Sequence, residues 1–250
     1  MREVCDLNGL NRNVARLFEN RDKVFVLALD HAQGGVIQGL EKPLDLMNLL
    51  SASQLDGFIL NVGLADKMGY GELLKKKLIL RSSFGGTMMS SEYTNAHANH
   101  VSPEIALRLG ADAVLMMFVL GGADYRSIQQ AAKDIDAYHL LGIPVIAEIL
   151  CDDFSKTSTY DIQMNGARVA AELGADVVKA FYTENFEKVV LNCLAPVILA
   201  GGPKGSNIVD IARNALNSGA RGLAFGRNIF QSPNPVELIK ELDNLFVYND

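Results

Sequence analysis

A lysine lies inside a stretch of the sequence that otherwise has the composition of a buried strand. Lys179 is flanked by Val177, Val178, Ala180 and Phe181. An ammonium buried without a partner carries a large free-energy cost and commonly loses its proton, and a neutral lysine attacks carbonyl groups. A lysine at a strand end could instead extend its charged end into solvent. We interpret Lys179 as a candidate nucleophile for amine catalysis.

Two carboxylates and an imidazole occur within or just after two other apolar runs. Glu148 is surrounded by apolar residues, and Asp30 and His31 follow an apolar run directly. A carboxylate near Lys179 could keep the lysine charged, act as an acid or base, or form a structural ion pair. An acid beside an imidazole suits proton transfer near pH 7, although a histidine at a strand end can also simply bond the backbone. These three residues are candidates for acid/base roles.

Two glycine-rich segments have the composition of phosphate-binding loops. One contains Gly201, Gly202 and Lys204, and the other contains Gly226 and Arg227. Glycines let backbone N–H groups approach an anion closely, the two basic residues add charge, and a helix is expected after each loop. The alternative is that both segments are only tight turns. The pattern predicts a site for the phosphate group of a small-molecule substrate.

Four other polar residues are candidates for metal or substrate contacts. His97 and His100 are three residues apart, a spacing that suits a metal on a helix, but their segment offers no carboxylate. We expect them to be loop residues, and we predict neither a metal nor a cofactor. Arg81 and Asn61 each end an expected strand and are plausible substrate contacts.

Apolar runs of strand length alternate with helical patterns along the chain. Runs that are apolar on both faces are typical of parallel strands covered by helices. The expected strands are residues 24–30, 57–61, 78–83, 112–118, 144–150, 176–182, 196–202 and 222–226. The expected helices are residues 10–19, 44–53, 64–77, 102–110, 125–141, 161–173, 184–193, 207–218 and 236–245.

Eight such rounds in 250 residues predict an α/β fold, a single (β/α)8 TIM barrel over residues 1–250 with a short leading helix. An open doubly wound sheet fits this count less well. Short segments at Leu109, Leu173 and Ser218 repeat a glycine between a helix and a strand, where it can provide a left-handed helix stop. Catalytic residues of such barrels lie at the carboxyl ends of the strands. The fold would therefore gather the candidate residues at one mouth.

The overall composition limits the classes of partner. The net charge is −6 at pH 7, and the three lysines at residues 75–77 are expected to be a solvated helix end, so nucleic acid is not an expected partner. No apolar run approaches the roughly 18 residues that a membrane-spanning helix needs, and the first residues lack a signal-peptide pattern. We expect a cytoplasmic protein with no membrane partner.

Four segments in order resemble the signature motifs of one enzyme family. They are LALDHAQG from Leu27, VVKAFY from Val177, LAGGPK from Leu199 and GLAFGRNIFQ from Gly222. They resemble the class I aldolases of archaeal fructose-bisphosphate aldolase type, in the deoxyribose-phosphate and tagatose-bisphosphate aldolase superfamily. The resemblance extends over nearly the whole chain.

The resemblance implies a role for each motif. Lys179 matches the lysine that forms a Schiff base with a ketone, Asp30 and His31 match the polar pair after the first strand, and the two glycine-rich segments match the phosphate site. It also implies a homo-oligomer, often a decamer.

The chain departs from the fructose-bisphosphate members at the end of the fifth expected strand. Those members have an acid/base tyrosine in a segment like SYPRG, where this chain has ILCDD with Leu150 at the expected tyrosine position. The branch that resembles the chain most is the thiolase acting on 3-hydroxy-5-phosphonooxypentane-2,4-dione, which also lacks this tyrosine. Tyr182, Glu148 or His31 could supply the proton transfer, and the sequence does not choose among them.

The expected function is that of a metal-independent, class I aldolase-type enzyme on a phosphorylated ketose or diketone. Three alternatives remain open at this point: thiolase-type acyl transfer to coenzyme A, an isomerase or synthase that uses acid/base residues on the same barrel, and a non-catalytic sugar-phosphate-binding protein.

Overall fold

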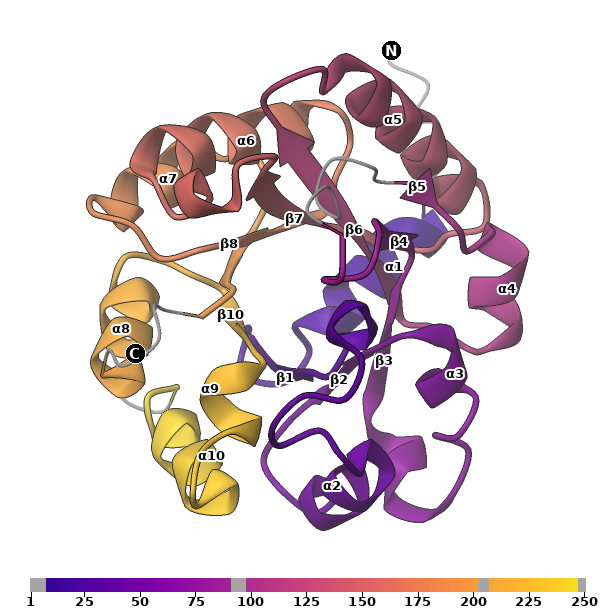
Figure 1. The fold of residues 1–250 in the computed structure, drawn as a ribbon, viewed down its shortest axis with the longest axis vertical. Helices are drawn as coiled ribbons and strands as arrows, with labels where there is room; N and C mark the ends of the chain where they lie inside the picture. The colour runs from indigo at the N-terminus through magenta and orange to yellow at the C-terminus, as the bar shows by residue number, and fades with distance from the viewer. Residues whose placement is uncertain (1–7, 91–97, 202–206, 247–250) are drawn as a thin grey trace.

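Eight parallel strands close into a barrel in the computed structural model, which describes residues 8–90, 98–201 and 207–246 (Figure 1). The order around the barrel is β1-β10-β9-β8-β7-β6-β3-β2. These strands are β1 (Val24–Ala28), β2 (Gly57–Leu60), β3 (Lys77–Arg81), β6 (Ala113–Leu120), β7 (Val145–Cys151), β8 (Val177–Ala180), β9 (Val197–Leu199) and β10 (Gly222–Phe225). The predicted (β/α)8 barrel is confirmed.

Helices surround the barrel and connect its strands (Figure 1). They are α1 (Asn8–Leu17), α2 (Pro43–Leu50), α3 (Val62–Ala65), α4 (Pro103–Arg108), α5 (Tyr125–Leu140), α6 (Tyr160–Glu172), α7 (Phe186–Asn192), α8 (Ile208–Asn217), α9 (Arg227–Phe230) and α10 (Pro235–Asn244). Three short 3₁₀ helices add to them: η1 (Ala32–Gly34), η2 (Gly71–Lys75) and η3 (Phe154–Lys156). Within the described part of the chain, none of the helices has the length and apolar character needed to cross a membrane.

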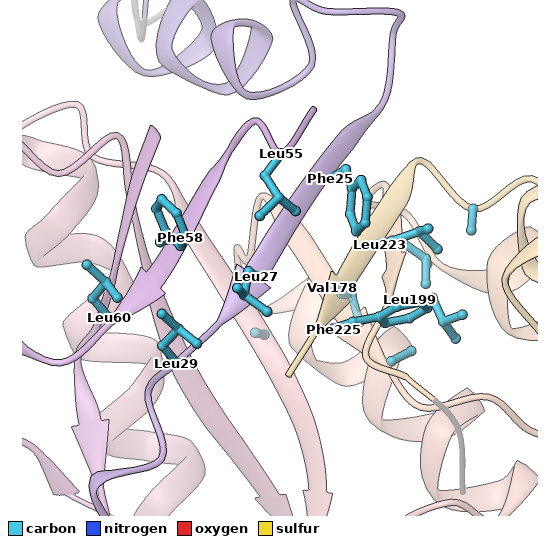
Figure 2. Packing of buried hydrophobic residues seen from close by; sticks show 14 of the residues in the cluster. Phe25, Leu27, Leu29, Leu55, Phe58, Leu60, Val178, Leu199, Leu223 and Phe225 are labelled. Carbon is cyan, nitrogen blue, oxygen red and sulfur yellow. The ribbon is translucent and has the colours of Figure 1, made fainter. Parts of the chain in front are cut away.

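Alternation along each strand divides the buried residues into two layers. Side chains such as Phe25, Leu27 and Phe225 point outward and fill the space between the strands and the helices (Figure 2). The intervening side chains, such as Val26 and Val177, fill the barrel interior. Both faces of each strand are therefore covered, which explains why the strands read as continuous apolar runs.

The leading helix closes the amino-terminal end of the barrel. Leu17 and Phe18, at the end of α1, are buried in the same cluster as the interior residues Val24 and Ile79. Helix α1 therefore fills the bottom of the barrel and leaves the carboxyl ends of the strands as the open mouth.

The predicted helix over residues 64–77 is wrong. The chain instead forms α3, a turn, and the 3₁₀ helix η2, and Gly71 takes a φ of +54° where η2 begins. Helix α3 ends at Ala65, and Tyr70 is extended just before η2, so the apolar periodicity of the segment suggested one helix where there are two short ones. A two-stranded antiparallel pair, β4 (Ser83–Phe84) with β5 (Ala98–Asn99), was also not predicted.

The predicted glycine stops are confirmed. Gly110, Gly174 and Gly219 follow α4, α6 and α8 with φ values of +68°, +104° and +94°. Each glycine turns the chain from the end of a helix toward the next strand of the barrel.

Candidate active site

Register places Glu148 and Lys179 side by side inside the barrel. Strand β7 pairs Glu148 with Lys179 of β8, and the neighbouring strand β6 pairs Met117 with Glu148. Val177 belongs to the inner layer, and Lys179, two residues further along β8, faces the same way. The closed barrel therefore brings the two buried charges of the sequence analysis into direct contact near the mouth.

Four buried charged side chains form a continuous row of opposite charges, which we call the ion-pair chain: Asp30, Arg81, Glu148 and Lys179. Lys179 Nζ lies 2.7 Å from Glu148 Oε1, and Arg81 Nη1 donates to Glu148 Oε2 at 2.7 Å. Arg81 Nε lies 3.2 Å from Asp30 Oδ2. The four side chains are between 5% and 8% exposed. The Glu148 carboxylate thus gives the buried Lys179 ammonium a partner, which offsets the cost of removing it from water.

Arg81, which the sequence offered as a substrate contact, is part of the buried ion-pair chain. It was predicted to contact substrate, but its guanidinium is buried and bound to two carboxylates. The signal that could have indicated this is strand alternation, because Arg81 lies two residues beyond the inward-facing Ile79 on β3. Arg81 therefore holds Asp30 and Glu148 in the interior.

The two cations of the ion-pair chain keep Glu148 ionised. Burial by itself would raise the pKa of Glu148, but the charges of Lys179 and Arg81, together with their hydrogen bonds, lower that pKa far below its ordinary value of 4.5. Glu148 is therefore a carboxylate near neutral pH, placed to stabilise a positive charge on Lys179 Nζ.

This lowered pKa predicts a loss of stability in acid. The unfolded chain binds a proton at Glu148 at a higher pH than the folded chain does, so the contribution of Glu148 to stability is present above about pH 4.5 and is lost as the pH falls below it. We expect the free energy of unfolding, measured by urea denaturation from pH 6 to pH 3, to fall less steeply in Glu148→Gln than in the wild type. Glu172→Gln, which changes an exposed carboxylate paired with Arg168, should keep the wild-type slope. An equal slope in Glu148→Gln and the wild type would contradict the assignment.

His31 lies beside the ion-pair chain at the end of β1. Its ring packs edge-on against Phe230 with centroids 5.1 Å apart, and a Cβ atom added to Gly226 would come within 2.7 Å of His31 Cε1. Burial lowers the pKa of His31; Asp30 opposes this shift, and the charges of Lys179 and Arg227 add to it. The imidazole is therefore neutral near pH 7. Its Nδ1 is buried without a hydrogen-bond partner among the described residues, which leaves that nitrogen able to give or accept a proton.

The described part of the predicted phosphate site lies at the ends of two adjacent strands. Strands β9 and β10 are paired; Gly226 follows β10 directly, and Gly201 lies two residues beyond the end of β9. Gly201 has a φ of +116°, and a Cβ there would lie 2.9 Å from Asn228 Oδ1, so this position requires glycine. Arg227 is exposed at the start of α9. Gly202 and Lys204 lie outside the described residues.

Tyr182 is not brought together with the ion-pair chain. Its ring packs against Phe186 of α7 with centroids 5.6 Å apart, and it contacts the outer hydrophobic layer. Because Lys179 faces the interior, alternation turns Tyr182, three residues on, toward the helices. Asn61 directly follows β2, and the register of β1, β2 and β3 places it level with Asp30 and Arg81, two residues beyond the inward-facing Ile59. The ring of His100 packs against Phe84. His97 lies outside the described residues.

Gln163 supports the site and was missed in the sequence. Its fully buried amide on α6 donates to Thr157 O at 2.6 Å and to Ile149 O at 3.3 Å, and its oxygen accepts from Phe181 N at 2.8 Å. The side chain therefore links the carboxyl end of β7, the strand of Glu148, to the carboxyl end of β8, the strand of Lys179. The sequence signal that could have indicated Gln163 is a polar residue at an apolar position of the helix expected over residues 161–173.

Known proteins that are similar to the chain identify its family. A family model described as "DeoC/LacD family aldolase" matches residues 20–232. The 2-amino-3,7-dideoxy-D-threo-hept-6-ulosonate synthase 1 of Archaeoglobus fulgidus is 31% identical over 237 residues, covering 94% of this chain and 89% of the relative. The 3-hydroxy-5-phosphonooxypentane-2,4-dione thiolase of an Enterobacter species is 32% identical over 239 residues, covering 93% and 79%.

Solved structures extend the similarity to the barrel itself. An archaeal fructose-1,6-bisphosphate aldolase, described with its catalytic lysine covalently bound to the carbinolamine intermediate of its substrate, matches with a TM-score of 0.84 at 26% identity. The match covers 95% of this chain and 99% of that one. The chain therefore belongs to the DeoC/LacD family of aldolases, as a carbon–carbon lyase of the class I, Schiff-base type.

Proposed function

We propose that Lys179 is the Schiff-base lysine of this aldolase and that the substrate is a phosphorylated ketose or diketone. The observation that carries the proposal is the Lys179 amine, buried at the mouth of the barrel and 2.7 Å from a carboxylate that stays ionised. Such a pair supplies a nucleophile together with a fixed counter-charge for the cation that forms on it.

Schiff-base formation leaves the charge of the site unchanged. The Lys179 ammonium first gives up one proton, which frees the lone pair that attacks the ketone. That proton leaves with the carbonyl oxygen as water when the iminium forms, so one cation at Nζ replaces another. Glu148 faces that nitrogen before and after the step. The site therefore needs no net proton uptake or release at this stage, and the counter-charge is already in place.

The carbon–carbon bond then breaks toward the iminium. The electron pair of the broken bond moves toward the iminium, which neutralises the nitrogen and forms an enamine. The hydroxyl on the leaving carbon gives up its proton, and that carbon becomes an aldehyde. Neutral His31, with its free Nδ1, accepts that proton, and Asp30 beside it favours the resulting imidazolium. The proton returns to the enamine carbon, and water releases the product from Lys179. Tyr182 takes no part, because it packs in the outer layer.

The phosphate group binds at the ends of β9 and β10. Gly201 follows β9, the neighbour of Lys179's strand, and Gly226 and Arg227 follow β10, the next strand around the barrel. The sequence adds Gly202 and Lys204 to the loop after β9. Binding energy from this remote group would position the carbonyl for attack.

The apolar residue at the end of β7 supports a second candidate function, acyl transfer from a phosphorylated diketone to coenzyme A. Leu150 is 3% exposed and offers no hydroxyl for an aldol proton relay. In this reaction the coenzyme A thiol forms a bond to the acyl carbon as the carbon–carbon bond breaks, and the thiol proton ends on the enamine. The relative from the Enterobacter species is named as such a thiolase.

Reductive trapping tests the proposed nucleophile. We expect sodium borohydride with dihydroxyacetone phosphate to attach the reduced ketone permanently to Lys179, located by peptide mass spectrometry. An unmodified Lys179, or trapping at another lysine, would overturn the proposal. Product analysis with and without coenzyme A separates the candidates, since only acyl transfer yields an acyl thioester.

We further infer from the family resemblance that the enzyme is a homo-oligomer, and from the composition of the sequence that it is cytoplasmic. Light scattering of the purified protein would measure the number of subunits.

A further inference from the structure

Asn61 presents an amide group to the barrel mouth from the end of β2. Ile59, two residues earlier, faces the interior, and the backbone of Asn61 is still extended, with φ of −76° and ψ of 159°. The side chain of Asn61 therefore faces the interior as well. It is half-buried, and because α1 closes the other end of the barrel, it is reached from the mouth.

The side-chain amide of Asn61 is unused within the part of the chain that the structure describes. Asn61 directly precedes α3, a position where an asparagine side chain commonly accepts a hydrogen bond from the helix backbone. Its backbone carbonyl accepts from Leu64 N and Ala65 N at 3.0 Å, but its side chain makes no capping bond. One donor group and one acceptor are therefore available to a ligand at the mouth.

Asn61 lies across the barrel from Lys179. In the closed order of eight strands, β2 and β8 are four strands apart in either direction. The space between these two strands is the space that a substrate bonded to Lys179 Nζ would occupy. Asn61 therefore borders the part of the substrate that points away from the lysine.

The strand order also places Asn61 beside the groups proposed to move the proton. Strand β2 lies between β1 and β3, and Asn61 is level with Asp30, which His31 follows directly. Arg81 is level with Asn61 on the other side, but its guanidinium is already bound to Asp30 and Glu148. Of these described side chains, Asn61 has the uncharged donor that is still available.

We propose that Asn61 is a further catalytic residue, whose Nδ2 donates a hydrogen bond to the oxygen on the leaving carbon of the substrate. The inference rests on the proposed function, because it takes Lys179 as the attachment point and His31 as the proton acceptor. During cleavage this oxygen changes from a hydroxyl to the carbonyl oxygen of an aldehyde. Its proton goes to His31 Nδ1, and the electron pair of the carbon–carbon bond goes to the iminium.

Asn61 itself neither gives nor takes a proton in this step. Its fixed amide dipole stabilises the negative charge that builds on the oxygen as the hydroxyl proton leaves. Removing one preorganised donor of this kind lowers kcat by about 10²- to 10³-fold.

Substitution at Asn61 separates cleavage from Schiff-base formation. Asn61→Leu has a similar shape and no donor, so we expect kcat for cleavage of a five-carbon ketose 1-phosphate to fall about 10²- to 10³-fold. Borohydride trapping of dihydroxyacetone phosphate on Lys179 should keep its wild-type rate, because this ketone has no leaving carbon. Asn61→Gln keeps the amide and should recover part of the lost kcat.

An asparagine that does cap a helix provides the matched control. The exposed Asn234 side chain accepts from Glu237 N at the start of α10. Asn234→Leu should therefore lower the urea concentration at the unfolding midpoint and keep the wild-type kcat. Asn61→Leu should keep the midpoint, since it breaks no capping bond, and lose kcat. Asn61→Ala serves in its place if the leucine variant does not fold.

The outcomes separate this inference from the proposed function. A wild-type kcat in folded Asn61→Leu, or an equal loss of cleavage and trapping in that variant, would overturn the inference while the wild type still traps dihydroxyacetone phosphate on Lys179. A wild type that traps this ketone but does not cleave the ketose phosphate would also overturn it. Failure of the wild type to trap dihydroxyacetone phosphate on Lys179 would instead reject the proposed function.

Discussion

Replacing Lys179 with methionine should lower kcat/KM for cleavage of a phosphorylated ketose by at least about 10⁴-fold, because the reaction loses its covalent intermediate. The remaining ion-pair chain still satisfies Glu148 through Arg81 at 2.7 Å, so the fold should survive the change. Lys179→Arg is the companion variant. It keeps a cation beside Glu148 but provides no nucleophilic amine, so it should be equally inactive.

For each Lys179 variant, the experiment measures both turnover and borohydride trapping. Lys240→Met removes an exposed lysine on α10 that lies near Glu237, and we expect this variant to keep wild-type activity and trapping. Circular dichroism of each variant confirms folding. Substantial activity in folded Lys179→Met would mean that the barrel works through acid/base residues alone, as an isomerase or synthase would.

Arg81→Met should lower the free energy of unfolding by about 3–5 kcal/mol, because removing one member of a buried ion pair leaves an uncompensated charge. Asp30 and Glu148 both lie against the Arg81 guanidinium, and all three side chains are at most 8% exposed. Asp30 would lose its cation, and Glu148 would keep only Lys179. Methionine fills a similar volume, so the loss would come from charge and hydrogen bonding rather than from a cavity.

Urea denaturation at pH 7 measures this effect. The matched control is Arg168→Met, the same substitution in the Arg168 and Glu172 pair, whose side chains are 50% and 53% exposed. An exposed pair contributes about 1 kcal/mol or less, so the control should be nearly as stable as the wild type. Equal stability losses in the two variants would show that burial does not determine the strength of the ion-pair chain.

Local patterns in the sequence were sufficient to predict the barrel. Each strand is apolar on both faces because helices cover the outside and side chains fill the inside, so every strand could be recognised from its own residues. Glycine stops at Gly110 and Gly174 are equally local. Local periodicity misled at residues 64–77, where α3 ends at Ala65 and the chain is extended at Tyr70 before η2 begins.

The sequence also indicated which residues are candidates for the chemistry. Lys179, Glu148 and Asp30 are charges within or after apolar runs, and their cost in such places is a property of composition that needs no coordinates. The proton-transfer partner could not be chosen in this way. Tyr182, Glu148 and His31 are all candidates from the sequence; in the barrel His31 lies at the mouth, and the ring of Tyr182 packs against Phe186 in the outer layer.

Closure of the barrel decided what these charges do to one another. Arg81 and Glu148 are 67 residues apart in the sequence, yet the strand order and register place their side chains 2.7 Å apart. The sequence indicated that a buried lysine needs a partner, but a pairing across the interior depends on register among β3, β7 and β8, which no local pattern contains.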